Sequence, residues 1–176
     1  TDQGVSEAEN TGEKLKEQGF NFDVMFTSEL KRAQNTGEII LEKLNELNLI
    51  TIKSVSLNER DYGDLTGMNK DEARAEFGEE QVHIWRRSYD VPPPGGESLK
   101  DTYDRVIPYF ESDIMPEIND SKNVLIAAHG NSLRSLVKFI EDLNDTDILK
   151  LEIATGEPII YKFIDGYKIF TDFSKR

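Results

Sequence analysis

The stretch Val124-Leu-Ile-Ala-Ala-His129-Gly-Asn131-Ser-Leu-Arg134 decides the fold that the sequence predicts. Five apolar residues typical of a buried strand run directly into a histidine, a glycine and a helical pattern over Leu133–Leu143. This order places His129 at the carboxyl end of a strand and before a helix N-terminus, where main-chain N–H groups and the helix dipole favour anions. Open α/β sheets bind ligands at that edge, and a phosphoryl group suits such a position. For His129 alone, a structural histidine bonded to a backbone carbonyl is the alternative.

Helical and extended segments alternate along the rest of the chain. Helices are predicted over residues 5–18, from a Thr27-Ser28 cap to about 47, over 70–77, 80–88 and 98–118 (bent near Pro108), and after Asp145. Strands are predicted over residues 22–26 and 50–57, with a closing hairpin of residues 159–164 and 167–173 turned at Asp165-Gly166. The alternation predicts an α/β sandwich with a mostly parallel sheet. A length of 176 residues fits one domain over residues 1–176.

Composition narrows the class of protein. The net charge of −13 argues against nucleic acid and anionic membranes as partners, although it leaves room for a small anionic substrate. No apolar run is long enough to span a membrane. The absence of cysteine excludes thiolate metal sites and fits a cytoplasmic location. With two histidines in the chain, His83 and His129, no metal is implied, and His83 is interpreted as a structural or surface residue.

Four further segments contain polar groups at places where ligands bind. They are Phe26-Thr-Ser-Glu-Leu-Lys-Arg32-Ala, Leu57-Asn-Glu59-Arg60-Asp-Tyr62-Gly-Asp-Leu-Thr-Gly67-Met-Asn-Lys70, Ile84-Trp-Arg86-Arg87-Ser-Tyr-Asp-Val-Pro-Pro-Pro94 and Gly95-Gly96-Glu97-Ser98. Each has a simple explanation on its own. Arg32 could be a solvated helix charge, Leu57 to Gly67 a surface loop, Arg86-Arg87 a solvated pair and the segment Gly95 to Ser98 a helix cap.

Together with the His129 stretch, these segments resemble the cofactor-dependent phosphoglycerate mutases of the histidine phosphatase superfamily. The resemblance extends from Thr1 to the final hairpin. It implies a three-layer α/β fold, a mostly parallel sheet flanked by helices. It also implies interconversion of 3-phosphoglycerate and 2-phosphoglycerate through a phosphohistidine, primed by 2,3-bisphosphoglycerate, with no metal. Two displacements of this kind are covalent catalysis.

The resemblance assigns a role to each matching residue. Glu59 matches the general acid/base, His129 the second active-site histidine and Arg32 a phosphate-binding arginine. The groups that hold the substrate's carboxylate and distal phosphate match Arg60, Tyr62, Lys70, Arg86 and Arg87, and the remaining ligand contacts match Gly130 and Asn131. Bidentate arginines suit carboxylates and phosphates better than lysines do.

One family element does not occur among the 176 residues. The family begins with a strand that ends in Arg-His-Gly, whose histidine is the nucleophile, followed by a loop that supplies further phosphate contacts. Thr1 matches the point just after that loop. We therefore expect the natural protein to carry this segment upstream and the domain to be incomplete at its N-terminus. The parent protein is expected to be an active mutase. The chain as given is expected to be inactive, and the loss of a central strand is expected to leave it fragile.

Two other functions remain open. A phosphatase of the same superfamily would transfer the phosphoryl group to water, although the segment Arg86 to Pro94 and Lys70 fit the mutase subgroup better. A phospho-ligand-binding homologue without catalysis would fit a gene that starts near Thr1. The oligomeric state is not fixed by the sequence, so a homo-oligomer is also open.

Overall fold

The computed structural model describes residues 1–164 and divides into two compact units. Among the described residues, the first unit comprises 1–58, 108–129 and 152–164, and the second comprises 59–107 and 130–151. That residues 1–176 form a single domain stays a prediction. No helix within the described residues is long and apolar enough to cross a membrane.

The first unit is built on a parallel sheet, as the sequence predicted. Its described strands are β1 (Val24–Thr27), β2 (Ile50–Lys53) and β3 (Val124–Ala127), in the order β2-β1-β3. Both pairings are parallel, with Thr27 opposite Lys53 on one side and Ala127 on the other. All four residues of β1 are buried, which explains why this strand is apolar throughout.

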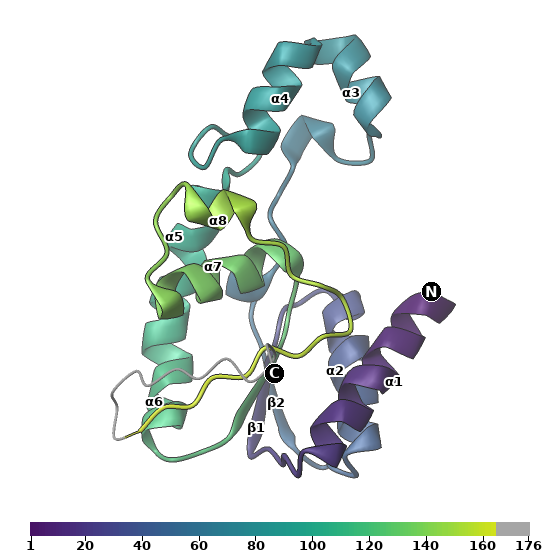
Figure 1. Cartoon of the computed structure of the whole chain (residues 1–176), viewed down its shortest axis with the longest axis vertical. Coiled ribbons are helices and arrows are strands. Elements are labelled where there is room, and N and C mark those ends of the chain that lie inside the picture. The colour runs from purple at the N-terminus through teal and green to yellow at the C-terminus, as the bar shows by residue number, and fades with distance from the viewer. Residues whose placement is uncertain (165–176) are drawn as a thin grey trace. The chain divides into compact units, whose positions relative to one another are not determined.

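Helices cover both faces of this sheet (Figure 1). Successive side chains of a strand point to opposite faces. Met25 packs with Leu41 of α2 (Lys31–Lys43), and its neighbour Phe26 makes an edge-to-face contact with Tyr109, ring centroids 6.3 Å apart. Tyr109 ends α5 (Leu99–Tyr109), and a π-helical turn (Phe110–Ile114) and α6 (Met115–Asn119) follow it. The parallel sheet flanked by helices is therefore confirmed.

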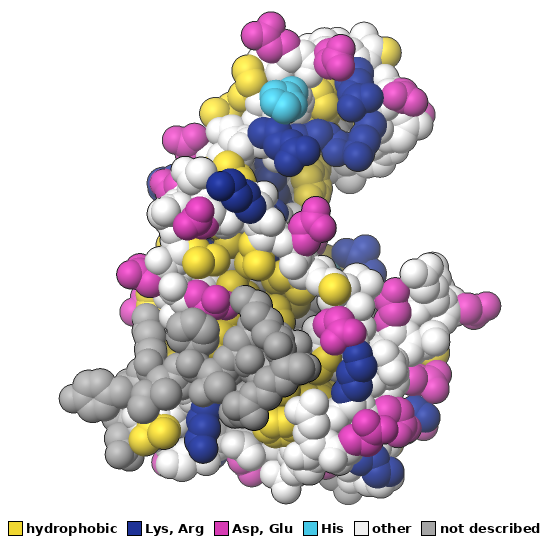
Figure 2. Space-filling model, in the orientation of Figure 1, with side chains coloured by type: hydrophobic (Ala, Val, Ile, Leu, Met, Phe, Trp, Pro, Cys, Tyr) yellow, Lys and Arg dark blue, Asp and Glu magenta, His cyan; other side chains and the backbone are white. Residues whose placement is uncertain are grey.

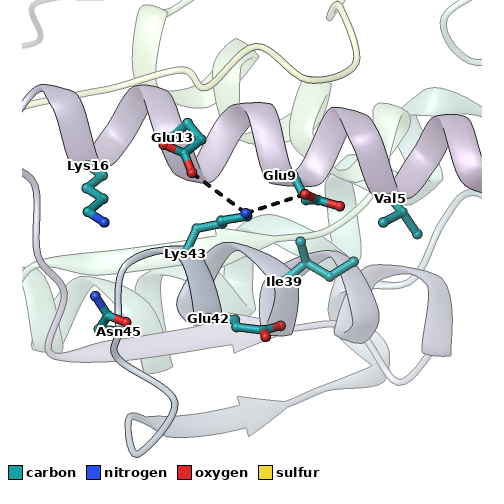
Figure 3. A pocket seen from close by; sticks show the side chains of 8 residues that line it. All are labelled: Val5, Glu9, Glu13, Lys16, Ile39, Glu42, Lys43 and Asn45. Carbon is teal, nitrogen blue, oxygen red and sulfur yellow. Dashed lines mark ion pairs between the residues drawn. The ribbon is translucent and has the colours of Figure 1, made fainter.

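The helix α1 (Asp2–Glu17) packs against α2 through a glycine. A Cβ atom at Gly12 would lie 2.7 Å from Cβ of Lys43, so only a residue without a side chain allows this approach. Nζ of Lys43 then reaches Glu9 at 3.4 Å and Glu13 at 3.7 Å (Figure 3). A groove of about 520 Å³ lies between the two helices, lined by charged residues of both.

The second unit contains α3 (Lys70–Phe77), α4 (Glu79–Arg87), most of α5, α7 (Gly130–Glu141) and α8 (Asp147–Lys150). The α3–α4 pair encloses an apolar cluster of Ala73, Val82 and Trp85. A second cluster joins Tyr89, Leu99 and Ile148. Nζ of Lys138 lies 5.2 Å and 5.0 Å from the ring centroids of Tyr89 and Tyr103.

Two loops of the second unit touch backbone to backbone. A side chain at Gly63, whose φ is +54°, would overlap the main chain of Pro94 to Gly96. A Cβ atom at Gly96 would lie 2.7 Å from the carbonyl oxygen of Asp61 and from the amide nitrogen of Gly63. The bond from the Asp64 N–H to the Pro94 carbonyl, 2.9 Å long, holds the loops together.

Several predicted boundaries were wrong. The second helix begins at Lys31 after Leu30, which makes no side-chain cap, and it ends at Lys43. The predicted 98–118 helix, expected to bend near Pro108, is divided: α5 continues through Pro108 to Tyr109, and the π-helical turn then separates it from α6. The stretch 50–57 is a strand only to Lys53, and a 3₁₀ turn (Val55–Leu57) completes it.

The helix α7, which follows His129, begins at Gly130, earlier than the predicted start at Leu133. Residues 159–163, predicted as the first hairpin strand, have no regular secondary structure, and Ile164 forms an isolated bridge. The second hairpin strand, residues 167–173, and its Asp165-Gly166 turn lie outside the described residues.

Candidate active site

His129 lies just past the carboxyl end of β3, as predicted, and is 5% exposed. Ser28 follows the last residue of the neighbouring strand β1. Because Thr27 and Ala127 are register partners, the residues that follow them emerge at the same sheet edge. Oγ of Ser28 lies 2.8 Å from Nε2 of His129. The sequence had suggested that Ser28 caps the second helix. In the structure its hydroxyl binds the imidazole of His129 instead.

Arg32, in the first turn of α2, contacts the other ring nitrogen. Its Nη2 lies 3.3 Å from Nδ1 of His129. A guanidinium can only donate, so we assign Nδ1 as the acceptor and place the ring hydrogen on Nε2, from where it is donated to Ser28. This pattern fits a neutral imidazole. The structure thus joins two predicted residues, Arg32 and His129, through one hydrogen bond.

Glu59 belongs to the second unit, where its carboxylate meets the start of α7. Its Oε1 accepts the N–H of Asn131 at 3.2 Å and the N–H of Arg60 at 2.8 Å. A Cβ atom at Gly130 would lie 3.9 Å from Oε2, so glycine leaves the approach open. The first N–H groups of a helix have no partner within it, and the helix dipole favours negative charge there. Glu59 therefore occupies an anion-binding position.

Asn131 connects Glu59, which it binds through its main-chain N–H, to Tyr62, which it binds through its side chain. Nδ2 of Asn131 donates to the Tyr62 hydroxyl at 2.9 Å, and Oδ1 accepts from Nη1 of Arg134 at 3.3 Å. These bonds fix which way the amide points. The structure thus brings the predicted residues Glu59, Tyr62 and Asn131 together.

Arg60 makes internal contacts, although the resemblance assigns it to the substrate. Its side chain is buried, Nε donates to the carbonyl of Glu97 at 2.6 Å, and the guanidinium lies 5.0 Å from the Tyr62 ring centroid. Burial lowers the pKa of this guanidinium from its ordinary value, against opposing effects of neighbouring groups such as Tyr62 and Glu59. Its role in substrate binding stays a prediction.

The other basic candidates lie on exposed helix surfaces. Lys70 begins α3, and Arg86 and Arg87 end α4. All three are exposed, as is Arg74 between them in sequence. Figure 2 shows Lys and Arg side chains gathered over these two helices, in a chain whose net charge is −13. His83, on α4, is exposed, in agreement with its interpretation as a surface residue.

Two residues beside Glu59 were missed by sequence reasoning. Nε and Nη2 of Arg105 donate to the Glu97 carboxylate at 2.8 and 2.9 Å. Burial by itself raises the pKa of the Glu97 carboxyl, but the bonds from Arg105 and the Asp61 N–H lower it, and the net pKa lies below 4.5. Glu97 was taken as part of a helix cap. The sequence offered one signal for this ion pair: Glu97 precedes the start of a helix, and Arg105, eight positions later, lies within it.

The described residues contain no group of three or more His, Asp or Glu side chains able to hold a metal ion. The groove between α1 and α2 contains none of the predicted site residues, and its Lys43 is ion-paired (Figure 3).

Residues 1–174 match the family model of the histidine phosphatase superfamily, branch 1. A protein of Bradyrhizobium sp. (strain ORS 278), named 2,3-bisphosphoglycerate-dependent phosphoglycerate mutase, is 60% identical over 162 residues, which are 92% of this chain and 78% of that protein. A protein of Parvibaculum lavamentivorans with the same name is 57% identical over 165 residues, 94% of this chain and 79% of that one.

Solved structures of similar fold include Bacillus stearothermophilus YhfR, with a TM-score of 0.82 and 23% identity over 99% of this chain and 83% of that one. The α-ribazole phosphatase from Shigella flexneri has a TM-score of 0.81 and 20% identity, over 98% of this chain and 82% of that one. At these identities the likeness concerns the fold.

Proposed function

The chain belongs to the histidine phosphatase superfamily, and we propose that it serves the interconversion of 3-phosphoglycerate and 2-phosphoglycerate, as a 2,3-bisphosphoglycerate-dependent mutase. The observation that carries this proposal is the Arg32–His129 contact at 3.3 Å. It holds a guanidinium and an imidazole at the carboxyl ends of parallel strands, where phosphoryl oxygens can replace their mutual bond. The absence of cysteine supports a cytoplasmic location.

In this proposal Arg32 and His129 stabilise the charge of the phosphoryl group during transfer. Arg32 gives up its bond to Nδ1 and donates to phosphoryl oxygens. His129 can donate from Nδ1 only once that nitrogen gains a proton, while Nε2–H stays bonded to Ser28. Donors arranged in advance around a developing charge are a large source of catalytic rate.

Glu59 is the proposed general acid/base. Its carboxylate would accept the proton of the attacking hydroxyl and return it to the leaving oxygen. Both resting hydrogen bonds end on Oε1, which orients the carboxylate and leaves Oε2 to exchange the proton. Gly130 leaves space beside Oε2, in keeping with its predicted ligand contact.

The exposed cations Lys70, Arg86 and Arg87 are proposed to hold the carboxylate and distal phosphate of the substrate, with Tyr62 and Arg60. Asn131, with Gly130, is proposed to make the remaining ligand contacts. A cationic surface on two helices of a strongly acidic chain fits a multiply charged anion such as 2,3-bisphosphoglycerate. That compound supplies the priming phosphoryl group when bound.

The nucleophile of the reaction must be a histidine in an Arg-His-Gly sequence, which the 176 residues do not contain. We therefore propose that this chain alone binds phosphoglycerates without becoming phosphorylated. Joined to a strand ending in Arg-His-Gly, as in the mutases, it is proposed to become a complete catalyst.

The test compares the 176-residue chain with a chimera in which a strand ending in Arg-His-Gly is joined ahead of Thr1. Radiolabelled 2,3-bisphosphoglycerate should give an acid-labile protein label in the chimera alone, and the chimera should convert 3- to 2-phosphoglycerate. Labelling of the unextended chain would contradict the assignment of its histidines. Release of inorganic phosphate without isomerisation would identify a phosphatase, and a chimera that only binds the ligand would identify a binding protein.

A further inference from the structure

We propose that Glu97 and Arg105 are positioning residues for Glu59: their ion pair fixes the main chain of Glu59–Asp61 and so aims the Glu59 carboxylate at the start of α7. The inference deepens the proposed function, because it concerns the residue proposed there as general acid/base. All of these residues belong to the second unit.

Arg105 contacts Glu97 with two nitrogens. Nε donates to Oε2 at 2.8 Å and Nη2 donates to Oε1 at 2.9 Å, the paired arrangement that gives an arginine–carboxylate contact its direction. The same Nη2 also donates to the main-chain carbonyl of Glu59 at 3.0 Å. The ion pair is thus attached to the backbone of the proposed general acid/base.

Glu97 holds the two residues that follow Glu59. Its Oε1 accepts the N–H of Asp61 at 2.9 Å, and its own N–H donates to the Asp61 carbonyl at 2.6 Å. Its carbonyl accepts Nε of Arg60 at 2.6 Å. Each of the consecutive residues Glu59, Arg60 and Asp61 is therefore bonded to Glu97 or Arg105.

The Glu97–Arg105 pair and its bonds to Glu59–Asp61 hold this segment as a clamp, which determines where the Glu59 carboxylate can reach. The Glu59 carboxylate accepts from two N–H groups. That of Arg60 belongs to the clamped segment, and that of Asn131 belongs to α7. Both bonds form only if the segment is held at the right distance from the helix. Moving the Glu59 backbone would break the Asn131 bond first, because the Arg60 bond moves with it.

Stability alone is a weak explanation for the pair. The side chains of Arg105 and Glu97 are 26% and 22% exposed, and removing two charges from water offsets much of their attraction. A pair with several directed bonds to one backbone segment instead specifies a geometry.

The test measures amide hydrogen exchange in the 176-residue chain by NMR, for Glu97→Gln, Glu97→Ala and Arg105→Lys. The Asn131 N–H has no partner within its helix, so its protection depends on Glu59. We expect its exchange to speed up by about tenfold in Glu97→Ala, by less in the two conservative variants, and by the full extent in Glu59→Ala, which removes the acceptor. The amides of Ser135 and Val137, inside α7, should be unchanged.

Asp104→Asn is the matched control, because it removes an exposed ion pair with Lys100 from the same helix α5. It should leave the Asn131 amide unchanged. An unchanged Asn131 amide in Glu97→Ala overturns the proposal, and so does equal acceleration throughout α7, which would indicate a stabilising role only. Arg105→Lys keeps the positive charge, so the proposal can still be tested if Glu97→Ala does not fold. Since no substrate is used, this result is independent of whether the chimera is a mutase.

Discussion

Nη2 of Arg32 donates to Nδ1 of His129 across 3.3 Å, so Nδ1 is a hydrogen-bond acceptor in the unliganded site. Its other nitrogen donates to Ser28 at 2.8 Å. A phosphoryl group needs donors, and the ring can supply one from Nδ1 only after taking up a proton. Phosphate binding is therefore expected to replace the bond between Arg32 and His129.

The first prediction concerns the tautomer of His129. Nitrogen NMR of the unliganded chain should identify the Nε2–H form, and the exposed His83 provides an internal reference in the same spectrum. Ser28→Ala removes the acceptor of that hydrogen, which should weaken the preference by about 1 kcal/mol. A dominant Nδ1–H form would contradict the assignment.

A second prediction separates the internal role of Arg60 from substrate binding. Arg60→Lys loses the directed bond to the Glu97 carbonyl, and we expect the free energy of unfolding to fall by about 1–3 kcal/mol. The control Arg86→Lys changes an exposed arginine and should stay within about 0.5 kcal/mol. Chemical denaturation measures both. Equal stabilities would show that the Arg60 contacts contribute little to folding.

The contact between α1 and α2 gives a third prediction. Alanine in a helix interior is ordinarily about 1 kcal/mol better than glycine. At Gly12 the added methyl would lie 2.7 Å from Cβ of Lys43 and 3.4 Å from Cα of Ile40. We therefore expect Gly12→Ala to lower the free energy of unfolding by about 1–3 kcal/mol. Asn10→Ala, at an exposed position of the same helix, should not lower it, and a stabilised Gly12→Ala would refute the close packing.

A fourth prediction follows from the low pKa of Glu97. A carboxyl whose pKa is lower in the folded state stabilises the fold above its unfolded pKa, near 4.5, and loses that contribution as pH falls through the folded value. Glu97→Gln should therefore reduce the stability difference between neutral and acidic pH. Thermal unfolding across that range measures it, with Asp104→Asn as the comparison. Parallel pH profiles in wild type and Glu97→Gln would contradict the predicted linkage.

The sequence predicted the order of the elements and the parts of the site that lie next to strong patterns. The apolar run of β3 places His129, and helix periodicity predicted α3 with its observed bounds. The sequence did not predict contacts made by residues whose type serves two purposes. Ser28 and Glu97 both precede helices and were assigned to caps. Serine and glutamate are equally good partners for an imidazole or a guanidinium that arrives from a distant part of the chain, and local patterns do not contain that information.

The backbone contact between Gly63 and Gly96 has a consequence for mutational scans of this chain. Any side chain at either position would separate the same two loops, one of which continues into the Glu97 main chain. Once one substitution has opened the contact, the second has little left to disrupt. Substitutions at the two glycines, which are far apart in sequence, should therefore lower the free energy of unfolding sub-additively: the double variant should be little less stable than either single variant.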